Sequence, residues 1–147
     1  MYGQNEGGEG MIASIHEIRK GWERHKMAEV LVCKDGEIAE GGVRVITAGA
    51  VEIGVIRHSG KYYAYRNLCP HQGGPVCEGV RMPAVLDVIA PDRTFLHQDY
   101  DRNDMHIVCP WHSYEFHLED GVNVCDKRIR LQKFNVTEKN GAVYVNV

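Results

Sequence analysis

The chain has 147 residues, of which 44% are hydrophobic and 25% are charged, a composition typical of one globular domain with a buried core. Its net charge of −3 offers no basic surface of the kind that binds nucleic acid, so we expect no nucleic-acid partner. No apolar run approaches the roughly 20 residues that span a bilayer, and the N-terminus lacks the features of a signal peptide. The sequence therefore predicts a cytoplasmic protein without membrane contact.

Residues 1–41 are predicted to form an N-terminal tail, a short helix and an edge strand. Ser14 and Glu17 match a capping box, in which each side chain satisfies a backbone N–H. Apolar residues follow at helical spacing and predict a helix over residues 15–26. We interpret this helix as a cover for one end of the domain, with a partner-binding helix as the alternative.

From residue 28 onwards, short runs of β-branched and aromatic residues alternate with turn dipeptides. Asp-Gly, Ala-Gly and Ser-Gly separate the runs in the first half, and Asn140-Gly141 separates two alternating runs near the C-terminus. Asn-Gly between such runs is the strongest short-range signal of a hairpin. The predicted fold is an all-β antiparallel sandwich or barrel.

Residues 80–106 contain two further candidate strands, AVLDVIA and TFLHQDY, on either side of Pro91-Asp92-Arg93. Acidic residues also gather in this segment, at Asp99, Asp101 and Asp104. They lack the glycine and the terminal glutamate of a calcium-binding loop, so we predict a solvated turn rather than a cation site.

Two segments combine cysteine with histidine. CPHQGGPVC contains Cys69-x-His71, and CPWHSYEF contains Cys109-x-x-His112. In a cytoplasmic chain, cysteines clustered with histidines favour metal binding over disulfides. Two thiolates and two imidazoles are a complete ligand set for one tetrahedral zinc ion or for one asymmetric iron–sulfur cluster.

The distribution of these ligands favours the iron–sulfur cluster. Structural zinc sites usually take two like ligands from one turn or helix face, whereas each segment here provides one cysteine and one histidine. In a diiron cluster, the two cysteines can bind one iron and the two histidines the other. Zinc stays open as the alternative.

The two segments resemble the paired boxes, C-x-H and C-x-x-H, of Rieske [2Fe–2S] proteins, and the resemblance covers about residues 42–147. It implies a Rieske-type β-fold with a small cluster-binding subdomain, and an inserted segment at about 80–106. It further implies one [2Fe–2S] cluster per chain. The implied ligands of the cluster and its metal ions are Cys69, His71, Cys109 and His112.

Departures from the family pattern indicate the kind of Rieske protein. Rieske proteins of respiratory and photosynthetic complexes carry an additional cysteine in each box, joined by a disulfide. Trp111 stands at the position of the additional cysteine of the second box, so the resemblance implies no such disulfide here. Tyr114 and Phe116 stand where serine and tyrosine hydroxyls donate hydrogen bonds to the cluster and its ligand. Because hydrogen bonds to sulfur raise the potential, we expect a potential near about −150 mV. Ser113 replaces a common glycine, which puts the local backbone geometry in question.

The chain therefore resembles soluble Rieske ferredoxins and ferredoxin-like components of ring-hydroxylating oxygenases. Only 35 residues follow His112, too few for a catalytic domain with a mononuclear iron site. We expect a non-catalytic one-electron carrier between a reductase and an oxygenase or other oxidoreductase. The alternatives are a small subunit permanently bound to a larger oxidoreductase, and a zinc-stabilised binding module. The segment 80–106 is predicted to form a hairpin beside the cluster that helps to select a redox partner, or else a tolerated surface loop.

Overall fold

The computed structural model describes residues 28–147, and the helix predicted over residues 15–26 lies outside this range. The described part of the chain is all-β, as predicted, with one short 3₁₀ turn, η1 (Val76–Glu78). Its strands are β1 (Glu29–Lys34), β2 (Val43–Ala48), β3 (Val51–His58), β4 (Lys61–Arg66), β5 (Arg81–Ile89), β6 (Phe95–Val108), β7 (Glu115–His117), β8 (Lys133–Lys139) and β9 (Ala142–Asn146). Over residues 28–147, no helix has the length and apolar character needed to cross a membrane.

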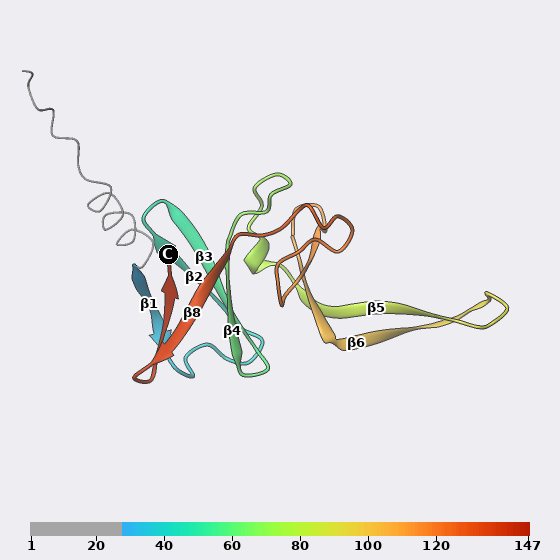
Figure 1. Ribbon diagram of the computed structural model, residues 1–147, viewed down its shortest axis with the longest axis horizontal. Helices are drawn as coiled ribbons and strands as arrows, with labels where there is room; N and C mark the ends of the chain where they lie inside the picture. Colours follow the sequence, from blue (N-terminus) through green and yellow to red (C-terminus); the bar gives the residue numbers. More distant parts are fainter. Residues whose placement is uncertain (1–27) are drawn as a thin grey trace, which may run out of the picture.

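The larger of two sheets contains six antiparallel strands in the order β1-β9-β8-β4-β3-β2. The sheet curls until it is nearly closed like a barrel (Figure 1). Tight turns join β3 to β4 and β8 to β9 at two of the predicted dipeptides. Asn140 and Gly141 have φ angles of 51° and 71°, and Ser59 and Gly60 have φ angles of 51° and 73°. Positive φ at both central residues is what a two-residue hairpin turn requires, and it matches the twist of the flanking strands.

The smaller sheet contains β5, β6 and β7, and it lies beside the barrel-like sheet (Figure 1). Ile107 on β6 pairs with Phe116 on β7, and both side chains are completely buried. They share a core cluster with Ile56 and Tyr65 of the larger sheet. Burial of each large apolar side chain contributes about 1.5–3 kcal/mol, so this cluster holds the two sheets together.

The predicted hairpin in the segment 80–106 is present, and it is long. Strands β5 and β6 pair from Arg81–Ile107 at the base to Ile89–Phe95 near the tip. Its outer half projects away from the rest of the molecule (Figure 1). The base of the hairpin adjoins the second Cys-His segment. There, Val108 N–H donates to the Val80 carbonyl (2.9 Å), directly before Cys109. The large apolar side chains that the hairpin exposes are Val85, Leu86, Ile89, Phe95, Leu96 and Tyr100.

The base of the hairpin also packs tightly against the end of the first Cys-His segment. A Cβ atom added at Gly79 would lie 1.7 Å from the Val108 carbonyl oxygen. No side chain fits within such a contact, so glycine is required at this crossing. Gly79 therefore fixes the spacing between the two segments that carry the cysteines and histidines.

Candidate metal centre

The two Cys-His segments form loops with the same hydrogen-bond frame. In the first loop, Cys69 N–H donates to the Gly74 carbonyl (2.8 Å) and the Cys69 carbonyl accepts from Gly73 N–H (2.8 Å). In the second loop, Cys109 N–H donates to the Tyr114 carbonyl (2.8 Å) and the Cys109 carbonyl accepts from Ser113 N–H (3.0 Å). Each cysteine is therefore held by both of its backbone polar groups at the same position of an equivalent turn.

The fourth residue after each cysteine has a left-handed backbone. The φ angle is +80° at Gly73 and +58° at Ser113. Glycine adopts this conformation without steric cost, whereas other residues lose about 1–2 kcal/mol. The second loop therefore keeps the backbone conformation that suits glycine. Ser113 adopts it at a cost in conformational energy.

The structure brings the four predicted site residues together as two pairs. Cys69 and Cys109 are each only 2% exposed, and Cys109 is close enough to raise the pKa of the Cys69 thiol. His71 and His112 are exposed, and their ring centroids lie 4.9 Å apart in an edge-to-face arrangement. The loops thus place two adjoining thiols inside the protein and two adjoining imidazoles at its surface.

Burial opposes negative charge at Cys69. It raises the pKa of the Cys69 thiol, and neighbouring Cys109 raises it further, while backbone N–H groups of His71 and Gln72 act in the opposite direction. Two buried thiolates side by side need positive charge close by. A bound metal centre provides that charge, so the donor chemistry fits an iron–sulfur cluster.

The contact between the two loops also fits a group held between them. A Cβ atom added at Gly74 would lie 3.0 Å from Cys109 Sγ and 2.8 Å from Trp111 Cγ. At Gly74, the backbone of the first loop therefore lies directly against the Cys109 sulfur of the second loop, with no side chain between them. Trp111 is 56% exposed, so it covers this contact from the solvent side and does not belong to the core.

Of the remaining cysteines, Cys77 shares the core cluster of this pair but belongs to neither box as a ligand. Cys77 is completely buried, and burial raises the pKa of its thiol to about 12. Cys33 is buried in the other core cluster, and Cys125 is exposed.

One contact to a predicted site residue has no signal in the sequence. The Tyr114 ring stacks on His71 with centroids 4.1 Å apart and planes 13° from parallel. The two residues belong to different loops, so their spacing along the chain does not indicate the contact. Phe116, by contrast, is completely buried and has no hydroxyl to donate. A hollow of about 520 Å³ borders the other imidazole, His112.

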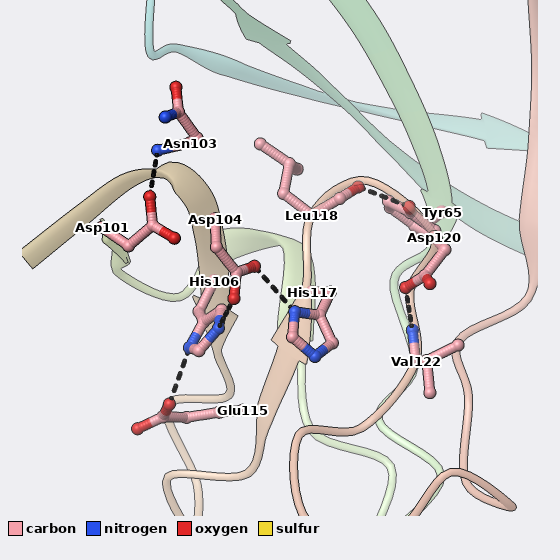
Figure 2. A network of polar contacts seen from close by, with 10 residues as sticks. All are labelled: Tyr65, Asp101, Asn103, Asp104, His106, Glu115, His117, Leu118, Asp120 and Val122. Atoms are coloured by element: carbon pink, nitrogen blue, oxygen red, sulfur yellow. Dashed lines mark hydrogen bonds and ion pairs between the residues drawn. The ribbon is translucent and has the colours of Figure 1, made fainter. Parts of the chain in front are cut away.

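The prediction of a solvated turn at Asp104 is wrong. Asp104 lies in β6, and its carboxylate contacts both His106 and His117 (Figure 2). Asp99 and Asp101 are also in β6, but their carboxylates accept hydrogen bonds from backbone N–H groups rather than from histidines. Sequence reasoning overlooked His106 because its spacing to the cysteines follows no ligand pattern.

The profile of the Rieske [2Fe-2S] domain family matches residues 28–135. The chain belongs to this family. It is 24% identical over 123 residues to the ferredoxin component of an alkene monooxygenase system from Xanthobacter autotrophicus, covering 84% of each chain. The fold resembles a chain from the complex of reduced oxygenase and oxidised ferredoxin in carbazole 1,9a-dioxygenase, with a TM-score of 0.59 and 25% identity over 80% of this chain and 92% of that one. It also resembles a nitrite reductase small subunit from Mycobacterium tuberculosis, described as putative and NADH-dependent, with a TM-score of 0.61 and 16% identity over 81% of this chain and 94% of that one.

Family membership confirms the predicted Rieske fold and identifies the family's cofactor as a [2Fe–2S] cluster. The two Cys-His loops fit such a cluster in donor chemistry, in burial and in close backbone approach. The ferredoxin relative and the oxygenase–ferredoxin complex support an electron carrier with redox-protein partners.

Proposed function

We propose that this Rieske protein carries single electrons from a reductase to an oxygenase or to another oxidoreductase. The observation that carries the proposal is the pairing of two buried thiols with two exposed imidazoles on equivalent loops. The relatives named as ferredoxin components of oxygenase systems support the same conclusion.

The proposed ligands are Cys69 and Cys109 for one iron, and His71 and His112 for the other iron, of one cluster per chain. When bound, the cluster supplies reversible one-electron transfer at a potential set by its ligands and their hydrogen bonds. Because the two cysteines are buried, their side of the site is closed to water. The exposed imidazoles offer the shortest route between the site and a docked protein.

Two features around the histidines suit this role. Tyr114 stacks flat on His71 and limits rotation of its ring, and such orientation of a ligand by its neighbours tunes a metal site. Beside His112, the hollow of about 520 Å³ leaves room for the side chains of a partner to approach the imidazole.

The experiment is a determination of iron, acid-labile sulfide and zinc in the purified protein, with visible and electron paramagnetic resonance spectra. We expect two irons and two sulfides per chain and a reduced-state signal that averages below the free-electron g value. Cys109→Ser should abolish this signal. Cys125→Ser is the matched control, since Cys125 is exposed and outside the loops, and it should leave the signal unchanged. A colourless protein with one zinc ion at the Cys-His loops would refute the proposal.

Size in solution separates a mobile carrier from a permanently bound subunit. A carrier should purify alone and accept electrons from a generic reductase. A permanent subunit should co-purify with a larger oxidoreductase when it is isolated from its native source. Location in the cytoplasm and the transfer of electrons from a reductase stay predictions.

A further inference from the structure

Strand β6, at the base of the hairpin, and its neighbour β7 carry the same short pattern, an acidic residue followed two positions later by histidine. On β6 the pair is Asp104 and His106, and on β7 it is Glu115 and His117. Because side chains of a strand alternate between faces, each pair lies on one face of its strand. The register places His106 directly opposite His117. Both patterns therefore meet on the same side of the sheet.

The donor atoms of three of these residues converge. His117 Nδ1 lies 2.7 Å from Asp104 Oδ1, and His106 Nε2 lies 3.3 Å from Asp104 Oδ2. The two imidazole rings are edge to face, with centroids 4.9 Å apart. One donor atom from each of the three residues falls within 4.8 Å of the others. Figure 2 shows the Asp104 carboxylate between the two rings.

His106 faces a carboxylate at each of its ring nitrogens. Its Nε2 faces Asp104, and its Nδ1 lies 3.0 Å from Glu115 Oε2. The residue is only 5% exposed, so water does not replace either contact. A neutral imidazole has one N–H donor and one bare lone pair, which leaves one nitrogen facing an acceptor without a proton between them. A cation at that nitrogen removes the conflict.

We propose that Asp104, His106 and His117 bind one divalent transition-metal ion of the zinc class, with Glu115 as the outer partner of His106. In this arrangement, His106 Nδ1–H donates to Glu115 and Nε2 binds the ion. A carboxylate that accepts from the far nitrogen of a ligating histidine is the usual way in which proteins fix the tautomer of such a ligand.

The donor set and its spacing suit this class of ion. Two imidazoles and one carboxylate are nitrogen and oxygen donors of the kind that bind zinc, and three protein ligands leave a position for water. In a tetrahedral site with metal–ligand bonds of about 2.1 Å, neighbouring donors are roughly 3.4 Å apart. The three donor atoms lie within 4.8 Å of one another, so side-chain shifts of roughly an ångström bring them to this spacing.

The site has an entry path and a clear structural consequence. The side chains of Asp104 and His117 are 38% and 33% exposed, so an ion reaches them from solvent. Strand β6 leads into the second Cys-His loop at Cys109, and β7 leaves that loop. The ion would therefore tie together the two stems of the loop. This inference does not depend on which metal centre the Cys-His loops bind.

The test is calorimetric titration with zinc chloride of the cluster-loaded protein, desalted after a chelator treatment that leaves its visible spectrum unchanged. We expect one ion per chain, and at least 100-fold weaker binding in His117→Ala and in Asp104→Asn. Glu115→Gln should weaken binding by about 10–100-fold, the usual cost of losing an outer partner. The matched controls His97→Ala and Asp99→Asn alter exposed residues farther out on the same hairpin and should bind zinc as the unaltered protein does.

X-ray absorption at the zinc edge provides a second measurement that does not rely on variants. Nitrogen and oxygen neighbours at about 2.0–2.1 Å are expected, whereas zinc in the Cys-His loops would show sulfur at about 2.3 Å. The proposal is overturned if the protein takes up no zinc, if the zinc shows sulfur neighbours, or if the Asp104 and His117 variants bind as tightly as the controls.

Discussion

Ser113→Gly should stabilise the protein, because Ser113 occupies a left-handed position in the second Cys-His loop, with φ at +58°. Relief of the steric clash of a non-glycine residue in this conformation is worth about 1–2 kcal/mol. Glycine gains extra freedom in the unfolded chain, which takes back about 0.5–1 kcal/mol. The expected net gain is about 0.5–1 kcal/mol in the free energy of unfolding.

The equivalent position of the first loop provides the reverse experiment. Gly73 has φ at +80°, and an added Cβ atom would meet only the Leu68 side chain at 3.4 Å, an ordinary contact. Gly73→Ala should therefore lose about 1 kcal/mol through backbone strain alone. Gln72→Gly, next to Gly73 but without positive φ, is the control and should give no gain.

Thermal unfolding of the cluster-loaded protein at a fixed scan rate measures these changes. A gain of 1 kcal/mol corresponds to roughly 2–4 °C in Tm for a domain of about this size. A lower Tm for Ser113→Gly, or equal shifts for Ser113→Gly and Gln72→Gly, would show that the backbone angle does not control stability at this loop.

Three further predictions concern redox chemistry, alkaline stability and the hairpin. The midpoint potential should lie near about −150 mV and fall with pH once the imidazoles lose protons; a flat potential between about pH 6 and 11 would argue against imidazole ligands. Burial raises the pKa of the Cys77 thiol from 9.0 to about 12, so above pH 9 the unfolded chain releases a proton that the folded chain keeps. Stability should then fall as the pH rises toward 12, by up to about 1.4 kcal/mol per pH unit, and denaturant titrations should show a shallower decline in Cys77→Ala. Replacement of residues 86–99 by Asn-Gly shortens the hairpin at the Val85–Tyr100 pair and leaves Asp104 in place. If the hairpin selects a partner, the rate of reduction by the native reductase should drop at least tenfold while the spectra stay unchanged; an unchanged rate would identify a tolerated surface extension.

Much of the strand pattern can be read from the chain because its signals are local. Turn dipeptides such as Ser59-Gly60 and Asn140-Gly141 need only their own backbone preferences to end one strand and begin the next. The residues AVLDVIA and TFLHQDY likewise predict the hairpin from their own composition. The outer half of the hairpin projects away from the barrel-like sheet because it does not pack against it. Packing between distant segments leaves no signal within the hairpin's own residues.

The sequence by itself determined the Cys-His boxes, and with them the family and the four candidate ligands, because a ligand motif consists of residue types at fixed spacing within one loop. Only the tertiary structure decided that the thiols are buried and the imidazoles exposed, that Tyr114 stacks on His71, and that Asp104 lies between two histidines. Those contacts join different loops and strands. Their geometry follows from strand register and from the crossing at Gly79, which are properties of the assembled core.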